Sequence, residues 1–197
     1  MEEAGGGEAN IRTRLAFQPV MDNAEAHKML GVMNLHWGKR KIQRTWWGMC
    51  YIMLRLEGTE LTTKNIRNYQ SEKLGRYSGN TLLTELMPIP KPKVHQWDYE
   101  DLIPQFGSRE EYYRVVKPRR IELLRGLIEE NKPRVVVGYG KGFWAEYREL
   151  LRGIVFIQEG QFQMAVFGDT LVILTGHFAA RSMNGRFDEL VKVLDDR

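Results

Sequence analysis

Chemically capable side chains follow short apolar segments of this sequence, at the points where those segments end. Asp22 and Asn23 follow the first segment, Glu85 lies in the second, and His177 directly follows the last. A carboxylate can orient water or stabilise positive charge, and an imidazole can donate a hydrogen bond to a leaving group. If the segments are strands of an open α/β sheet, we expect these groups at the carboxyl ends of the strands, where ligands bind.

A glycine-rich segment, Gly138 to Gly142, follows a third apolar run and invites comparison with a phosphate-binding loop. No Ser or Thr follows Lys141, and the glycine spacing matches neither nucleotide-binding fingerprint. We therefore interpret this segment as a turn between a strand and a helix.

The elements that would position these groups follow from the spacing of apolar residues. Strands are predicted over residues 14–19, 81–87, 134–138, 154–157, 162–167 and 170–175. Helices are predicted over residues 21–35 (capped by Asp22 or Asn23), 41–56, 62–74 (ended by Gly75), from Ser108 through 117–130, and over 143–151 and 187–194. This alternation predicts an α/β fold, a three-layer α/β/α sandwich with a central, mainly parallel sheet of about four strands. We expect one domain over residues 11–197, after a disordered tail over residues 1–10.

The composition restricts the class of protein. Apolar residues make up 43% of the chain and charged residues 27%, and no apolar stretch is long enough to cross a bilayer. The N-terminus is acidic and glycine-rich and lacks the pattern of a secretory signal, so we expect a cytoplasmic protein. The single cysteine, Cys50, excludes an internal disulfide and a cysteine-rich zinc site, and its apolar surroundings predict a packing role. We expect neither a metal nor a cofactor.

The charge is compatible with a polyanionic partner. The net charge is +4 and the isoelectric point is near 9.2. Basic residues form two groups, which solvated helix ends would explain equally well. They are Lys39, Arg40, Lys41 and Arg44, and then Lys117, Arg119 and Arg120.

Three segments together resemble the uracil-DNA glycosylase superfamily. The segment TLVILTGHFAARSMN (170–184) is similar to its closing motif, a histidine followed by a loop that enters the DNA minor groove. NTLLTELMPIPKP (80–92) is similar to the strand that carries the base-reading side chain, and RVVVGYG (134–140) takes the place of its third strand. The resemblance extends from about Arg14 to Leu194. It implies an enzyme that flips an altered base out of double-stranded DNA and hydrolyses its N-glycosidic bond to leave an abasic site.

The resemblance also implies roles for single residues. His177 would donate a hydrogen bond to the departing base, and Asp22 or Asn23 would act on the sugar side, where an oxocarbenium-like charge develops. The first motif keeps a proline after Gln18 but lacks the family's glycines, so the choice between Asp22 and Asn23 stays open. Gln18, Glu85 and Tyr139 would contact the flipped base. The predicted DNA-binding residues are Phe178 and Arg181 in the wedge loop, with Lys39, Arg40 and Lys91.

Glu85 stands where the family usually has Asn, and this difference predicts the base. An ionised carboxylate only accepts hydrogen bonds, which suits the exocyclic amino group of cytosine and not the O4 oxygen of uracil. We therefore expect a modified cytosine as substrate, such as the glucosylated hydroxymethylcytosine of phage DNA, and a role in antiviral defence. The alternative for Glu85 is a surface or ion-paired acid.

Other functions fit the same sequence. The same chemistry could serve repair of uracil or hydroxymethyluracil. A non-catalytic nucleic-acid-binding or inhibitory protein could share the fold, and a nucleoside hydrolase is a weaker alternative. We expect a monomer that binds DNA, without a membrane or a protein partner.

Overall fold

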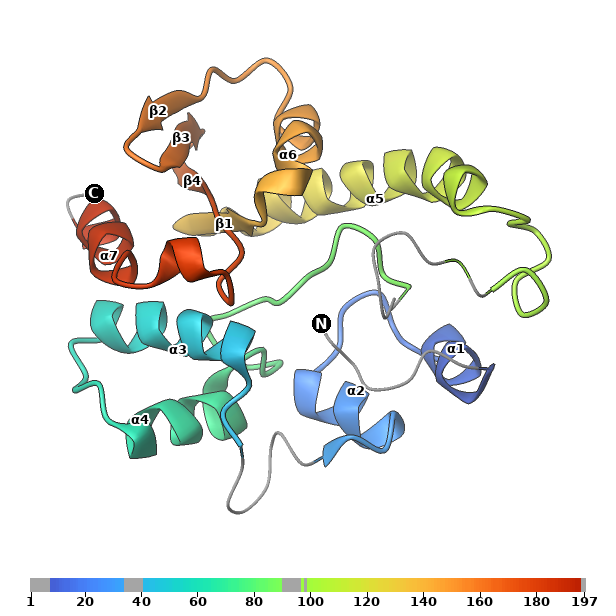
Figure 1. Cartoon of the computed structure of the whole chain (residues 1–197), viewed down its shortest axis with the longest axis horizontal. Helices are drawn as coiled ribbons and strands as arrows, with labels where there is room; N and C mark the ends of the chain where they lie inside the picture. Colours follow the sequence, from blue (N-terminus) through green and yellow to red (C-terminus); the bar gives the residue numbers. More distant parts are fainter. Residues whose placement is uncertain (1–7, 34–40, 90–96, 98, 196–197) are drawn as a thin grey trace. The chain divides into compact units, whose positions relative to one another are not determined.

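The computed structural model describes residues 8–33, 41–89, 97 and 99–195 (Figure 1). Its contacts divide the chain into two compact units. The N-terminal unit comprises residues 1–33 and 75–124, and the sheet unit comprises residues 34–74 and 125–197. Each unit is described by itself below.

The N-terminal unit holds two short helices and the first part of a long one. These are α1 (Glu8–Leu15), α2 (Asn23–Met29) and α5 (Arg109–Asn131), whose C-terminal end from Arg125 belongs to the sheet unit. The backbone N–H of Glu111 donates to Ser108 Oγ over 3.1 Å, which confirms the predicted cap of α5. Helix α1 begins at Glu8, inside the tail predicted over residues 1–10, and residues 1–7 lie outside the described part of the chain.

The sheet unit holds the remaining elements. Its longer helices are α3 (Arg44–Leu56), α4 (Thr63–Asn68), α6 (Trp144–Leu150) and α7 (Phe187–Asp195). A π-helical turn η2 (Tyr69–Lys73) continues α4, and 3₁₀ turns η3 (Lys141–Phe143) and η4 (Arg181–Met183) precede α6 and α7. The strands are β1 (Val135–Tyr139), β2 (Ile157–Glu159), β3 (Phe162–Phe167) and β4 (Thr170–Thr175). The sequence predicted most of these elements to within a few residues.

The prediction of a mainly parallel sheet was wrong. The described strands form one mixed sheet in the order β1-β4-β3-β2, in which only β1 and β4 are parallel. β2 pairs antiparallel with β3, and β3 with β4. The reason is the length of the connections, since two residues join β2 to β3 and two join β3 to β4. Such turns form hairpins, whereas a parallel connection needs a dozen or more residues.

Glycine makes both hairpin turns possible. Gly160 and Gly168 occupy the first position of their turns, with φ of 57° and 59°. Side chains disfavour this left-handed conformation, which two-residue hairpins require. The β-branched and aromatic residues of the three strands indicate strands but not direction, and these two turns set the direction.

Two further strands predicted from the sequence were also wrong. Residues 14–15 end α1 and residues 16–19 form no strand, while residues 81–87 form no ladder with any described strand. In residues 81–87, a side chain donates to backbone carbonyls that a neighbouring strand would otherwise pair with. The Arg120 guanidinium donates to the backbone carbonyls of Glu85 over 2.6 Å and Leu86 over 3.4 Å.

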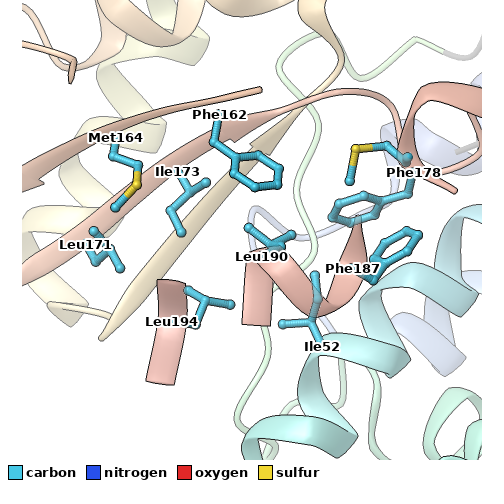
Figure 2. Packing of buried hydrophobic residues seen from close by; sticks show 10 residues of the cluster. Ile52, Phe162, Met164, Leu171, Ile173, Phe178, Phe187, Leu190 and Leu194 are labelled. Atoms are coloured by element: carbon cyan, nitrogen blue, oxygen red, sulfur yellow. The ribbon is translucent and has the colours of Figure 1, made fainter. Parts of the chain in front are cut away.

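Helices cover both faces of the sheet. One face buries Phe162 and Met164 of β3 and Ile173 of β4 against Leu190 and Leu194 of α7 (Figure 2). Ile52 of α3 belongs to the same cluster. Successive residues of a strand point to opposite faces, so Leu174 faces the other side. There a Cβ on Gly138 would meet both Leu174 and Tyr147 of α6, at 2.8 and 2.9 Å, which places α6 against that face.

Among the described residues, no helix combines the length and the apolar character that crossing a bilayer would require. Cys50 is fully buried in α3, as its predicted packing role requires, and burial raises the pKa of its thiol to about 12.

The approach of α3 to α7 depends on Gly48, and a pair of glycine substitutions tests it. A Cβ at Gly48 would lie 2.7 Å from the Phe187 ring and 3.0 Å from Phe178 Cβ, whereas nothing lies within 4 Å of one at Gly126 in α5. Gly48→Ala should lower the free energy of unfolding by about 1–3 kcal/mol through overpacking. Gly126→Ala should raise it by up to about 1 kcal/mol, because alanine favours a helix. Urea unfolding measures both, and equal stabilisation by the two substitutions would contradict this packing.

Candidate functional site

The parallel pairing of β1 with β4 brings the ends of these two strands together. Tyr139 lies opposite Thr175 in the register, so the residues that follow both strands start from the same edge. The backbone N–H of Gly140 donates to the Thr175 carbonyl over 2.9 Å, and the Trp144 indole donates to the same oxygen over 3.1 Å. Gly140 has a φ of 101°, which lets the chain turn directly into η3. The glycine-rich segment is therefore a strand-to-helix turn, as predicted.

His177 is exposed at this edge, next to Tyr139. The two ring centroids are 5.4 Å apart with the planes at 70°. The backbone N–H of Ala179 donates to His177 Nδ1 over 3.2 Å. Because Nδ1 accepts a hydrogen bond, the neutral imidazole carries its proton on Nε2. In that neutral form, Nε2 is the hydrogen-bond donor of the ring.

Phe178 lies in the core instead of the surface loop. It is 5% exposed and stacks on Tyr139 with centroids 4.9 Å apart and planes at 17°. Entering DNA would require it to abandon this packing, so we do not retain Phe178 as the wedge. Arg181, at the start of η4, is exposed, and the predicted wedge role then rests on it.

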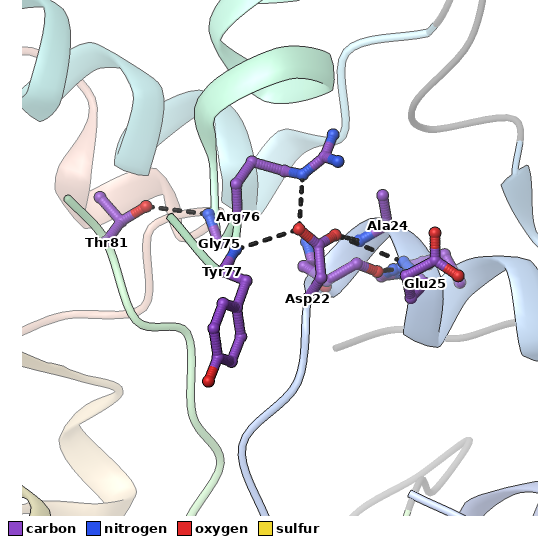
Figure 3. Close-up of polar contacts among 9 residues, drawn as sticks. Asp22, Ala24, Glu25, Gly75, Arg76, Tyr77 and Thr81 are labelled. Atoms are coloured by element: carbon purple, nitrogen blue, oxygen red, sulfur yellow. Dashed lines mark hydrogen bonds and ion pairs between the residues drawn. The ribbon is translucent and has the colours of Figure 1, made fainter. Parts of the chain in front are cut away.

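Asp22 lies in the N-terminal unit, where it caps α2 and binds Arg76 (Figure 3). One carboxylate oxygen accepts from the N–H of Ala24 over 2.8 Å and that of Glu25 over 3.4 Å. The other accepts from Arg76 Nε over 2.9 Å and from the N–H of Tyr77 over 3.0 Å. A carboxylate offers about four lone-pair positions, and these four donors occupy them. The side chain is 16% exposed.

These contacts determine what Asp22 can do. Burial raises the pKa of its carboxyl, but hydrogen bonds from Tyr77, Arg76 and Ala24 outweigh burial, so the pKa is lowered overall. The residue is an ionised structural group whose acceptor positions are filled from within the chain. It is a poor candidate for orienting water.

Asn23, the other candidate for the sugar side, differs from Asp22 in the hydrogen bonding of its side chain. Its backbone N–H donates to the Gly75 carbonyl over 2.9 Å, which holds the start of α2. The side chain is 7% exposed, and its Nδ2 has no hydrogen-bond partner among the described residues. A buried donor without a partner costs about 1–3 kcal/mol, and such groups often mark functional sites. Of the two residues, Asn23 is the better candidate for the chemical role.

Glu85 lies close to two arginines of the same unit. Burial lowers the pKa of Arg14 and of Arg120, and the negative charge of Glu85 opposes that effect at both. Arg14 also donates to the Pro88 carbonyl over 3.4 Å, so both arginines bind backbone carbonyls of the segment that contains Glu85. This charge arrangement gives Glu85 a structural role that needs no bound base.

The remaining predicted residues are less constrained. Gln18 is exposed in the coil after α1. Lys39, Arg40 and Lys91 lie outside the described residues. The structure therefore brings His177, Tyr139 and Phe178 together in the sheet unit, and Asp22 and Asn23 belong, with Glu85, to the N-terminal unit.

Sequence reasoning missed two groups of residues. Arg76 completes the Asp22 site from 54 positions along the chain, and nothing in the local sequence connects them. Trp47 of α3 and Phe187 of α7 line a surface groove, and the sequence pointed to neither as a binding residue. The helical spacing of apolar residues indicates packing and gives no signal for such a groove.

Among the described residues, no three His, Cys, Asp or Glu side chains come together in a way that could hold a metal ion. A scan against protein-family models and searches of curated proteins and of solved structures found no match to this chain.

The role of Asp22 as a structural carboxylate has a measurable consequence. Asp22→Ala should lower the free energy of unfolding at neutral pH by about 1–2 kcal/mol, because a helix cap is lost. The folded pKa lies below the unfolded one, so the stabilisation is present above about pH 3.9 and is lost as the pH falls through the folded pKa. The deficit of the variant should therefore shrink in acid. Urea unfolding at several pH values measures it, with the exposed Glu25→Ala of the same helical turn as control. A deficit that is independent of pH would contradict the role of the charge.

Proposed function

We propose that this protein is a DNA glycosylase that hydrolyses the N-glycosidic bond of a modified base, with His177 assisting the departure of the base. The observation that carries the proposal is the pair of His177 and Tyr139 at the adjacent ends of β4 and β1. In open α/β sheets, ligands bind beyond the carboxyl ends of the strands. The resemblance of segments 134–140 and 170–184 to the uracil-DNA glycosylase superfamily supports the same location, whereas segment 80–92 forms no strand and belongs to the N-terminal unit.

The proposed reaction is a hydrolysis. The bond between C1′ of the sugar and the nitrogen of the base breaks, and its electron pair leaves with the base. The Nε2–H of His177 donates a hydrogen bond to the oxygen on which negative charge develops. Water adds to C1′, and its proton ends on the released base, which leaves an abasic site. Tyr139 offers an aromatic ring beside the imidazole for the flipped base.

DNA binding rests on exposed cations. Arg181 is exposed four residues after His177, where a guanidinium can bind phosphate and stack on a base. The net charge of +4 supports a polyanionic substrate.

We propose a modified cytosine, such as glucosylated hydroxymethylcytosine, as the base, on the acceptor character of Glu85. Uracil or hydroxymethyluracil is the alternative, because the two arginines near Glu85 give its carboxylate charged neighbours within the chain, so the carboxylate need not contact a base.

A non-catalytic nucleic-acid-binding protein is the second candidate function. The Asp22 contacts favour it, since the one acid that follows the first apolar segment is committed to a helix cap and to Arg76. Incubation of the protein with duplexes that carry natural or modified bases, followed by detection of abasic sites, separates the two functions. Abasic sites with none of the bases, together with retained DNA binding, would establish the second.

Substitution of the donor tests the proposed chemistry. His177→Ala should lower the rate of base excision by roughly 10²–10³, because one hydrogen-bond donor to the developing charge is lost. DNA affinity should change little, and the exposed Lys192→Ala of α7 serves as control. Single-turnover excision and equilibrium binding measure the two quantities. A rate within twofold of the unsubstituted protein would remove His177 from the mechanism.

Substitution of Glu85 tests the base. If its carboxylate accepts from a cytosine amino group, Glu85→Gln should slow excision of a cytosine-type base roughly ten- to a hundredfold, the effect of losing a charge-assisted hydrogen bond. Excision of a uracil-type base should fall less. Equal losses on both bases, together with a lower unfolding free energy, would assign Glu85 to the arginine cluster and end the argument for cytosine.

A further inference from the structure

An open groove lies on the sheet unit, between the start of α3 and the segment that leads into α7. Its volume is about 350 Å³. The side chains that line it are Ile42, Arg44, Trp47, Phe178, Asn184 and Phe187. All six belong to the sheet unit, and neither His177 nor Tyr139 is among the described residues of its lining.

The apolar walls of the groove are aromatic rings fixed by their own packing. Trp47 meets the Phe187 ring edge to face, with centroids 5.2 Å apart. The ring centroids of Phe187 and Phe178 are 5.6 Å apart, and Phe178 stacks on Tyr139. Figure 2 shows Phe178 and Phe187 side by side. Phe178 and Phe187 are 5% and 6% exposed and form the packed base of the groove, whereas Trp47 is only partly buried. The Trp47 ring, held by its neighbours, needs little ordering when a planar ligand packs on it.

The polar groups of the groove are a guanidinium and an amide. Arg44 is exposed and forms no ion pair with another described residue, and the first turn of α3 holds no acid. Asn184 is exposed after η4, where its backbone N–H donates to the Arg181 carbonyl over 3.1 Å. An amide side chain both donates and accepts hydrogen bonds, which suits the edge of a nucleobase.

This combination fits one kind of ligand. A purely apolar ligand would leave the Arg44 charge unused, and an acidic peptide would leave the aromatic walls unused. A nucleotide uses both, because its base stacks on rings and its phosphate pairs with a guanidinium. The volume lies at the lower end of the range for small-ligand sites, which suits a single nucleotide.

We propose that this groove binds an unpaired nucleotide of DNA, with the base on the Trp47 ring and the phosphate on Arg44. The inference rests on the proposed function, since it takes DNA as the substrate. Because His177 and Tyr139 lie outside the lining, the bound nucleotide is not the one whose glycosidic bond is cut. Phe178 follows His177 directly, so the groove would hold the strand close to that residue.

Binding of a short labelled oligothymidylate, measured by fluorescence anisotropy at fixed salt, tests the proposal without catalysis. Arg44→Ala should weaken binding about tenfold, through the loss of a charge-assisted phosphate contact. Trp47→Phe should weaken it severalfold, because a smaller ring offers less stacking area. The matched control is Arg55→Ala on the same helix, since Arg55 pairs with Asp188 at 3.6 Å and does not line the groove. Its affinity should stay within twofold.

Three results would overturn the proposal. One is equal weakening by Arg44→Ala and Arg55→Ala, which indicates attraction without a site. Another is competition by inorganic phosphate as effective as that by thymidine monophosphate, which excludes stacking. The third is displacement of the oligonucleotide by an acidic peptide with equal affinity. The urea midpoint of each variant separates these effects from loss of folding.

The outcome is independent of the reaction itself. Abasic sites formed by the unsubstituted protein, together with an Arg44→Ala variant that binds normally, would reject the groove and keep the glycosylase. Specific binding at the groove without abasic sites from any base would keep the groove and reject the glycosylase.

Discussion

The parallel ladder between β1 and β4 is the contact on which the candidate site depends. All other strand pairs of the described sheet are antiparallel neighbours joined by two-residue turns, which form locally. β1 and β4 instead pair across α6 and a complete hairpin, in a register that sets Tyr139 opposite Thr175. Among the described strands, only this parallel pairing makes the carboxyl ends of two strands adjacent, and it places the imidazole of His177 beside the Tyr139 ring. A β4 held by β3 alone would leave His177 without that neighbour.

A row of aromatic rings continues from this edge through the sheet unit. His177 meets Tyr139, Tyr139 stacks on Phe178, Phe178 packs on Phe187, and Phe187 meets Trp47. The rings come from the ends of β1 and β4, from α7 and from α3, and the absence of a side chain at Gly48 lets α3 approach them. The buried rings of this row stabilise the core, and the partly buried Trp47 at its end also lines the groove, so packing and the proposed ligand binding share residues.

The N-terminal unit illustrates how hydrogen bonding limits chemistry. Asp22 and Asn23 are neighbours in the sequence, yet one has every acceptor position filled and the other keeps a buried donor without a partner among the described residues. The Asp22 carboxylate is stable because donors from the start of α2, from Arg76 and from Tyr77 occupy all of its acceptor positions. The group that has not been satisfied is the one that can still bind something else.

The sequence by itself determined the local elements of the sheet unit: α3 and α7 by helical spacing, and β1, β3 and β4 by apolar β-branched runs. These features depend on residues close together in the chain. The sequence also encodes the direction of the strands, because the short turns at Gly160 and Gly168 form hairpins. The alternation of strands and helices elsewhere in the chain favoured a parallel sheet instead, and the prediction followed that alternation. Only the tertiary structure decided that residues 81–87 form no strand, that Arg76 saturates Asp22 and that Phe178 is buried. Each of these outcomes depends on a partner far away in the sequence, and local propensity contains no information about which distant group will be within hydrogen-bonding or packing distance.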